Sequence, residues 1–268
     1  MAGEPSNENA LLRKLATNRS AICMPIRMSR SAHIVAMAQA AGFDAIYMDM
    51  EQSDIPFDAI SNLSRLASAS GVTPLVRVPT VDPLTIGRVL SGGAGGIIVP
   101  HVNTVEDART AVAAARFPPL GQRATAGVSL ALSYAPLSAM EAEKRLDRQT
   151  MVIVMIESGE AVANAAAIAA VPGIDMLLVG TGDLGRDLGV HGQHQHPKIR
   201  DAYAAVAAAC HANKRWLGVA GIKGVAAAPI LKDLYRLGAR FISARTDEAL
   251  LLSASRDEAA ALRELFAE

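Results

Sequence analysis

The sequence predicts an α/β protein of the (β/α)8 TIM-barrel class, folded as one domain over residues 1–268. Three observations predict it. Short apolar runs alternate with longer helix-like runs, eight such pairs follow one another without a break in composition, and the chain is close to the ~250 residues of a typical barrel. An open doubly wound sheet uses the same alternation and is the competing architecture.

The strands are predicted from eight short apolar runs. The runs are rich in Ile, Val, Leu and Met without polar alternation, as expected of parallel strands that are covered on both faces. The predicted strands are Ala21–Pro25, Asp44–Asp49, Thr73–Val78, Gly95–Pro100, Met151–Ile156, Asp175–Val179, Trp216–Val219 and Arg240–Ser243.

Helices are predicted between these strands and after the last one. Several carry capping signals, such as Asp82 before Pro83 and Gly71 after Ser70. The long connection 117–150 contains a further short helix near Leu137–Leu146 and has the length of a functional loop. The predicted main helices are Ser31–Ala41, Phe57–Ser70, Pro83–Ser91, Val105–Arg116, Glu160–Ala170, Lys198–Ala212, Val225–Leu237 and Asp247–Leu265.

Composition excludes several classes of protein. The 26 basic and 26 acidic side chains balance, so no net charge favours nucleic acid or an anionic membrane, and no apolar run reaches the ~18 residues of a membrane span. Cys23 and Cys210 are predicted to be buried, which favours a reducing compartment. Residues 1–9 are polar and acidic and lack the pattern of a signal peptide. We therefore expect a cytoplasmic protein.

Charged residues directly follow several predicted strands. Asp49 and Glu51 end the second strand, Arg77 the third, Glu157 the fifth and Asp183 the sixth. The carboxyl ends of barrel strands form the active site, and ionised groups placed there must be paired, hydrated or metal-bound. This cluster indicates a catalytic site at the barrel mouth.

Glu157 and Asp183 are predicted to hold a divalent metal. Two carboxylates with open coordination positions suit Mg2+ or Mn2+, and a 2-oxo acid would chelate such an ion, which then acts as a Lewis acid for an enolate. Arg77 would add positive charge beside the enolate oxygen. The alternatives are structural, with Asp183 as a helix cap and Arg77 paired with Asp49 or Glu51.

At these residues the sequence resembles the HpcH/HpaI aldolase family, the metal-dependent class II pyruvate aldolases. The resemblance runs from about Arg13 to the C-terminus. It rests on the order of several short motifs: Gly42-Phe43-Asp44 with Asp49-Met50-Glu51, Val76-Arg77-Val78-Pro79, Val99-Pro100-His101-Val102-Asn103-Thr104, Phe117-Pro118-Pro119-Leu120-Gly121-Gln122-Arg123, Ile156-Glu157-Ser158 and Gly180-Thr181-Gly182-Asp183-Leu184.

The resemblance implies a carbon–carbon lyase that cleaves 4-hydroxy-2-oxo acids to pyruvate and an aldehyde, or a decarboxylase of oxaloacetate. It implies a cofactor of Mg2+, Mn2+ or Co2+ on Glu157 and Asp183, with Arg77 on the pyruvyl oxygen. It also implies a homo-oligomer, commonly a hexamer built as a trimer of dimers, in which the C-terminal helix is exchanged between subunits.

The resemblance further assigns the substrate carboxylate to the backbone at Gly180, Thr181 and Gly182. Arg123 is expected to anchor the Pro-rich loop near the active site, with contact to a substrate carboxylate as an alternative role.

Two departures from the family pattern bear on proton transfer. Gln52 stands where the family usually has a histidine that works with the aspartate, here Asp49; glutamine orients a water but cannot titrate. Met155 stands where the family often has glutamine. His101 and Tyr134 are conceivable replacements for the histidine. These departures leave a decarboxylase, or a non-catalytic 2-oxo acid binding protein, as rival hypotheses.

Two further patterns are interpreted as structural. Residues 180–185 match the dinucleotide fingerprint G-x-G-x-x-G, but they follow the sixth strand and carry an acidic residue in the turn. His191, His194 and His196 lie in a polar loop and are expected to be solvated or to lie between subunits.

Overall fold

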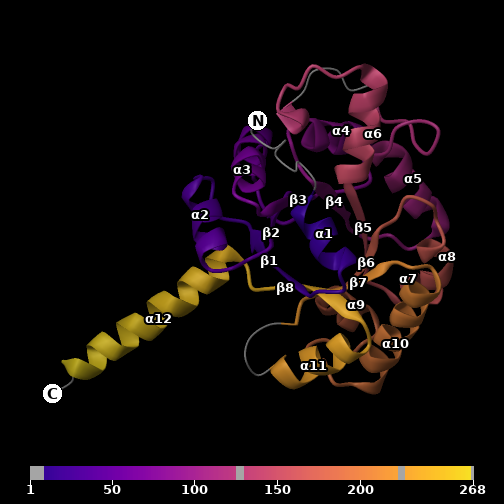
Figure 1. The fold of residues 1–268 in the computed structure, drawn as a ribbon. Helices are drawn as coiled ribbons and strands as arrows, with labels where there is room; N and C mark the ends of the chain where they lie inside the picture. Colours follow the sequence, from indigo (N-terminus) through magenta and orange to yellow (C-terminus); the bar gives the residue numbers. More distant parts are fainter. Residues whose placement is uncertain (1–8, 125–129, 223–226, 267–268) are drawn as a thin grey trace.

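The computed structural model describes residues 9–124, 130–222 and 227–266 and shows a closed barrel (Figure 1). All eight strands are parallel and pair in sequence order, with β8 closing onto β1. The strands are β1 Ala21–Ile26, β2 Ala45–Asp49, β3 Thr73–Arg77, β4 Gly96–Val99, β5 Met151–Ile156, β6 Met176–Gly180, β7 Trp216–Ala220 and β8 Ala239–Ser243. The predicted fold class and the eight strands are confirmed.

Helices surround the barrel (Figure 1). Their bounds are α1 Ala10–Ala16, α2 His33–Ala40, α3 Phe57–Ala69, α4 Pro83–Ser91, α5 Val105–Ala115, η1 Leu130–Leu132, α6 Ala139–Gln149, α7 Gly159–Ala163, α8 Ala165–Ala169, α9 Thr181–Asp187, α10 Pro197–Ala212, α11 Ala228–Arg236 and α12 Asp247–Leu265.

The helices differ from the sequence predictions in several places. The predicted helix Glu160–Ala170 is two helices that meet at Asn164, whose side chain donates to the backbone carbonyl of Asn103. The predicted start of α11 at Val225 lies outside the described residues, as do residues 1–8 at the N-terminus. Helices α1 and α9 were not predicted as helices, because both are short and lack a long apolar period.

Helix α1 closes the floor of the barrel. The Asn9 side chain caps the helix and donates to the carbonyls of Gly95 and Gln149, both at 2.8 Å. Leu11 and Leu15 pack into the cluster of side chains that fills the barrel. Burial of these two leucines explains why a helix of seven residues is stable here.

Strand residues alternate between the barrel interior and the helix layer. On β5, Ile153 and Met155 belong to the interior cluster, whereas Val152 and Val154 pack against the helices. Because side chains two positions apart share a face, the residue that follows Met155 on the inner face is Glu157 at the mouth. The apolar Met155 thus lies in the barrel filling beneath it.

Helix α12 extends away from the barrel as an isolated arm (Figure 1). Asp247, at its first turn, is its one buried residue among those described. Several large apolar side chains farther along are exposed, namely Leu251, Leu252, Leu262 and Leu265, followed by Phe266. An arm of this kind gains little stability from its own subunit.

Two expectations from composition agree with the structure. Cys23 and Cys210 are both buried and free of disulfides, and burial raises the pKa of the Cys210 thiol to about 12. Among the described residues, no helix has the length and apolar content that crossing a membrane requires.

Candidate active site

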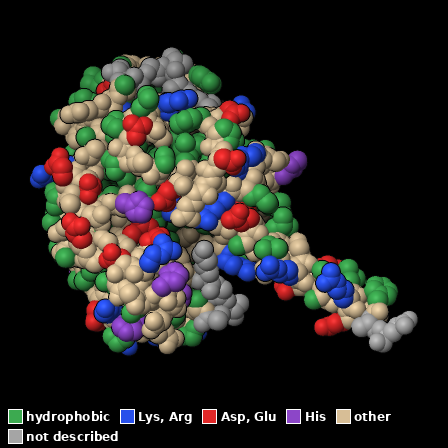
Figure 2. All heavy atoms as spheres, turned by 180° about the vertical axis from the view of Figure 1, so that it is seen from behind, with side chains coloured by type: hydrophobic (Ala, Val, Ile, Leu, Met, Phe, Trp, Pro, Cys, Tyr) green, Lys and Arg blue, Asp and Glu red, His purple; other side chains and the backbone are tan. Residues whose placement is uncertain are grey.

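The candidate site lies at the carboxyl ends of the strands. Figure 2 shows the face of the molecule opposite to the view of Figure 1, with acidic, basic and histidine side chains gathered near its middle. The register places Asp49 at the end of β2 directly beside Arg77 at the end of β3. Glu157 and Asp183 follow β5 and β6, which are also neighbours. The barrel therefore brings together the residues that the sequence singled out after strands two, three, five and six.

Arg77 and Asp49 form a buried bidentate ion pair. Arg77 Nε and Nη2 donate to the two Asp49 carboxylate oxygens at 2.9 and 2.6 Å, and Arg77 Nη1 lies 2.5 Å from Glu51 Oε2. Burial alone would raise the pKa of the Asp49 carboxyl, but the hydrogen bonds and charges of Arg77 and Arg27 outweigh it and hold this pKa below its ordinary value. Asp49 is thus a fixed anion that orients Arg77.

Glu157 is a buried carboxylate that depends on a glycine in the next strand. A Cβ built on Gly180 would lie 2.5 Å from Glu157 Oε1, so only glycine leaves room for this side chain. Glu157 Oε2 accepts a hydrogen bond from the His101 backbone N–H at 3.0 Å. His101 has a φ of 55°, an uncommon conformation for a side chain with a Cβ, which aims this N–H at the carboxylate.

Negative charge concentrates around Glu157. Burial raises the pKa of its carboxyl, the backbone N–H and imidazole of His101 oppose this rise, and the neighbouring carboxylates of Glu51 and Asp183 add to it. Asp183 lies in the first turn of α9 and is partly exposed, with Arg186 Nη1 at 3.0 Å from its Oδ1. Close carboxylates of which one is buried fit a divalent cation, which would neutralise them.

The donor set is small. Within the described parts of the chain, no three His, Cys, Asp or Glu side chains converge as a ligand group. Mg2+ is typically bound by one or two protein carboxylates, with water and substrate oxygens completing its coordination. Glu157 and Asp183 fit this mode of binding.

The backbone after β6 is held open by another glycine. A Cβ on Gly221, whose φ is 86°, would lie 3.0 Å from the backbone nitrogen of Gly182 and 3.4 Å from that of Thr181. The Thr181 side chain is buried and bonded to the Tyr203 hydroxyl and the Ala220 carbonyl, at 2.6 and 2.7 Å. Thr181 therefore offers its backbone, not its hydroxyl, to a ligand.

Gln52 is held by an arginine that the sequence analysis missed. Arg27 Nη2 donates to Gln52 Oε1, and Arg27 Nε donates to Asp49 Oδ2 at 2.7 Å. Because its carbonyl oxygen is occupied, Gln52 keeps its NH2 group for hydrogen bonds at the mouth. The signal was available in the sequence, since Arg27 directly follows the first strand and continues its inward-facing positions.

His101 also reaches the mouth, where its imidazole bridges two carboxylates. Its Nε2 lies 2.9 Å from Glu51 Oε1 and its Nδ1 lies 3.4 Å from Glu157 Oε2. The sequence analysis named His101 as a conceivable replacement for the missing histidine, and the structure places it within the site. Tyr134 is exposed in the long connection after β4, and no described contact ties it to the mouth.

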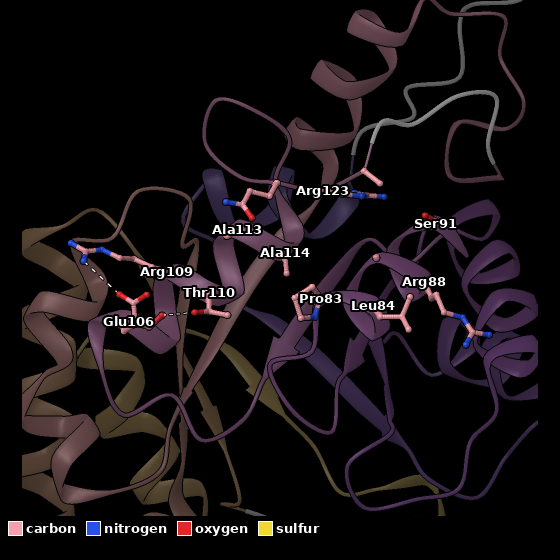
Figure 3. A pocket seen from close by; sticks show the side chains of 13 residues that line it. Pro83, Leu84, Arg88, Ser91, Glu106, Arg109, Thr110, Ala113, Ala114 and Arg123 are labelled. Atoms are coloured by element: carbon pink, nitrogen blue, oxygen red, sulfur yellow. Dashed lines mark hydrogen bonds and ion pairs between the residues drawn. The ribbon is translucent and has the colours of Figure 1, made fainter.

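The structure does not bring Arg123 to the mouth of its own barrel. Its backbone N–H bonds to the Arg116 carbonyl, and the Arg116 side chain bonds to the carbonyl of Thr150, just before β5 begins. The Arg123 guanidinium stacks on the Phe117 ring, and burial lowers its pKa to about 10. Figure 3 shows Arg123 lining a pocket beside α4 and α5 on the outside of the barrel. Arg123 thus contacts Phe117 of the Pro-rich loop that it was expected to anchor, and the alternative role on a substrate carboxylate stays a prediction.

The two patterns interpreted as structural fit the fold. Residues 180–185 end β6 and form most of α9, so they do not open a dinucleotide-binding unit. His196 caps α10 by accepting from the Lys198 backbone N–H, and His191 Nδ1 lies 3.3 Å from the Gly182 carbonyl oxygen.

Comparison with known proteins identifies the family of this chain. The family model of the HpcH/HpaI aldolase/citrate lyase family matches residues 27–248. The chain is 38% identical to the 4-hydroxy-4-methyl-2-oxoglutarate aldolase tasA of Hapsidospora irregularis, with 91% of each chain covered. It is 36% identical to the 4-hydroxy-4-methyl-2-oxoglutarate aldolase cghB of Chaetomium globosum, with 96% of each covered.

A solved structure agrees as well. The HpcH/HpaI aldolase from Desulfitobacterium hafniense superposes with a TM-score of 0.88 at 29% identity, covering 95% of this chain and 96% of the other. The resemblance inferred from short motifs is thereby confirmed over the whole barrel. The chain belongs to the HpcH/HpaI aldolase/citrate lyase family and is an aldolase-type carbon–carbon lyase.

Proposed function

We propose that this enzyme cleaves a 4-hydroxy-2-oxo acid to pyruvate and a second carbonyl compound at the mouth of the barrel. The observation that carries the proposal is the placement of Glu157 and Asp183 just after the adjacent strands β5 and β6, with the buried Arg77–Asp49 pair at the same mouth. A divalent cation held by the two carboxylates would supply a Lewis acid for the 2-oxo group. The aldolase relatives named above support this reaction class.

Arg77 would stabilise negative charge that develops on the 2-oxo oxygen. Three of its nitrogens are already engaged by Asp49 and Glu51, and the guanidinium has further N–H groups for the substrate. Because Asp49 fixes the guanidinium in a buried position, no reorganisation is needed as charge develops. The role of Asp49 in this proposal is to position Arg77, since its own oxygens accept from both arginines.

The substrate carboxylate would bind the backbone N–H groups of Thr181 and Gly182. Gly221 supports this assignment, because any larger residue there would crowd both nitrogens. Gly180 leaves the space that the Glu157 side chain needs. Glycines on β6 and after β7 thus shape the end of the site that holds the 2-oxo acid.

Gln52 would bind the oxygen on C4. Its amide NH2 donates a hydrogen bond to the hydroxyl group before cleavage and to the carbonyl oxygen after it. Since glutamine does not titrate, the hydroxyl proton leaves through solvent or another group.

The test is pyruvate release from 4-hydroxy-2-oxo acids by the purified protein with Mg2+, Mn2+ or Co2+, measured with a coupled lactate dehydrogenase assay. We expect release that EDTA abolishes and added metal restores. Absence of pyruvate release with all three metals, together with no exchange of pyruvate methyl protons in D2O, would refute the proposal.

A second candidate reaction is decarboxylation of oxaloacetate at the same site. The observation that favours it is Gln52, because decarboxylation needs no group to remove a proton from a hydroxyl. A kcat/KM for oxaloacetate above that for every 4-hydroxy-2-oxo acid tested would select it.

We also propose that the enzyme is a homo-oligomer in which α12 packs on another copy of the chain. The support is the series of exposed apolar side chains on an arm that leaves its own barrel (Figure 1). The resemblance to a family with exchanged C-terminal helices also indicates that α12 packs on a second copy of the chain.

A further inference from the structure

Arg27 occupies the side of the mouth that faces the proposed metal ligands. It follows β1, and β1 and β2 lie across the closed order of eight strands from β5 and β6, which carry Glu157 and Asp183. We propose that Arg27 binds a carboxylate on C4 of the substrate, so that the second product is a 2-oxo acid instead of a simple aldehyde. This inference rests on the proposed function and names its substrate class.

The backbone of Arg27 is fixed from two sides. The buried Asp247 carboxylate accepts N–H groups from the segment after β1, including those of Arg27 at 2.9 Å and Ser29 at 2.8 Å. The Arg30 guanidinium donates to the Arg27 carbonyl at 2.7 Å. An arginine at the rim of a site is usually mobile, whereas the main chain of Arg27 is held in place by these hydrogen bonds.

The side chain is oriented by groups at the site itself. Arg27 Nε donates to Asp49 and its Nη2 donates to Gln52, so two of the three guanidinium nitrogens are held in place. A guanidinium held in this way loses little further freedom when it binds a carboxylate.

The third nitrogen is held less tightly than the other two. Among the described residues Arg27 Nη1 has no hydrogen bond, and it forms a long ion pair at 3.9 Å with Glu248, whose side chain is exposed. The Arg27 side chain is 24% exposed, so the group is open to the solvent at the mouth. Guanidinium N–H groups match the geometry of a carboxylate, and such charge-assisted hydrogen bonds are among the strong ones.

The chemistry places a C4 substituent next to this group. With C1 and C2 of the substrate at Glu157, Asp183 and the backbone of Gly182, the chain of carbons runs across the mouth toward Gln52. In the reaction the C3–C4 bond breaks, its electron pair forms the pyruvate enolate, and the C4 hydroxyl loses its proton to become a carbonyl. A proton then returns to C3. Any second group on C4 lies beside the oxygen bound to Gln52, and therefore beside Arg27.

The experiment compares two substrates that differ only at this group. The first is 4-hydroxy-2-oxoglutarate, with a C4 carboxylate, and the second is 4-hydroxy-2-oxopentanoate, with a methyl group there. Both are assayed for pyruvate with wild type and with the variants Arg27→Met, Arg27→Lys and Arg109→Met at saturating Mn2+. Arg109 is the matched control, because it is an exposed arginine of α5 that pairs with the exposed Glu106 and contacts no described residue of the site.

We expect wild type to prefer the carboxylate substrate. Arg27→Met should lower kcat/KM for the glutarate roughly 10- to 100-fold more than for the pentanoate, through the loss of a charge-assisted hydrogen bond. Arg27→Lys should retain part of the preference, and Arg109→Met should leave the ratio of the two substrates as in wild type.

Other outcomes would overturn the inference. An equal loss for both substrates in Arg27→Met would mean that Arg27 only positions Gln52 and Asp49. Wild type that cleaves the pentanoate at least as well as the glutarate would refute the carboxylate site. This test uses no variant, so it holds even if a variant fails to fold. Wild type that cleaves neither substrate and exchanges no pyruvate methyl protons would overturn the proposed function as well.

Discussion

Arg27 donates a hydrogen bond to the side-chain oxygen of Gln52, and this contact decides which half of the glutamine amide faces a substrate. Unlike a histidine, which titrates, Gln52 offers a pair of N–H donors whose direction is fixed by this contact. In the proposed reaction these donors would stabilise the C4 oxygen by hydrogen bonding, without a proton-accepting side chain at this position.

The first prediction concerns Gln52→Leu. Loss of this donor should lower kcat/KM for aldol cleavage about 10- to 100-fold, the worth of one strong hydrogen bond. Exchange of pyruvate methyl protons in D2O should change much less, because enolisation involves no C4 oxygen. NMR measurement of that exchange alongside pyruvate release checks it. Equal losses in both assays would mean that Gln52 acts on the whole site.

The second prediction concerns the glycine that makes room for Glu157. Gly180→Ala would place a methyl group 2.5 Å from Glu157 Oε1 and should weaken Mn2+ binding at least about tenfold by displacing the carboxylate. Gly182→Ala is the matched control, because a Cβ there meets nothing within 4 Å. Isothermal titration with Mn2+ measures both. Unchanged Mn2+ affinity in Gly180→Ala would show that Glu157 is not a metal ligand.

The third prediction concerns the dependence of stability on pH. Because the pKa of Asp49 is lowered in the folded protein, its contribution to stability is complete above the ordinary value of ~4 and is lost as pH falls through the lowered pKa. Asp49→Asn should reduce the free energy of unfolding at pH 7 and flatten its decline below about pH 4. Urea denaturation between pH 3 and 7 measures both. A slope identical to that of wild type would show that Asp49 does not carry this dependence.

The fourth prediction concerns the arm formed by α12. Leu262→Asp combined with Leu265→Asp should shift the protein to a smaller assembly, since charge would be buried where apolar side chains are expected to pack. Glu264→Gln, in the same turns, should leave the assembly unchanged. Analytical ultracentrifugation distinguishes the species. A monomeric wild type would contradict the proposal at once.

Sequence patterns predicted the barrel well because each strand is a buried apolar run with no polar face. Ranges such as Met151–Ile156 agree with the structure residue for residue. The same rule, applied to the residues at the carboxyl end of each strand, found Asp49, Arg77 and Glu157 together. In the structure the first strand is one residue longer than predicted and ends at Ile26. With that end, the same rule would also have found Arg27.

Other features depend on contacts between residues distant in sequence. Nothing near Asn9 indicates that its side chain bonds to the carbonyls of Gly95 and Gln149, so α1 was missed. Arg123 was associated with the site through its motif, but the chain turns back at Arg116 and holds it against Phe117 instead. Spacing along the chain does not say at which end of a barrel a loop lies.

The packing of α1 across the end of the barrel has a consequence for synthesis of the chain. Asn9 bonds to Gln149, 140 residues later. At translation rates of about 5 to 20 residues per second, the leucines at positions 11 and 15 are synthesised roughly 7 to 28 s before that partner. Until the strands have been made, these two apolar side chains have no barrel interior to pack into and stay exposed on the nascent chain.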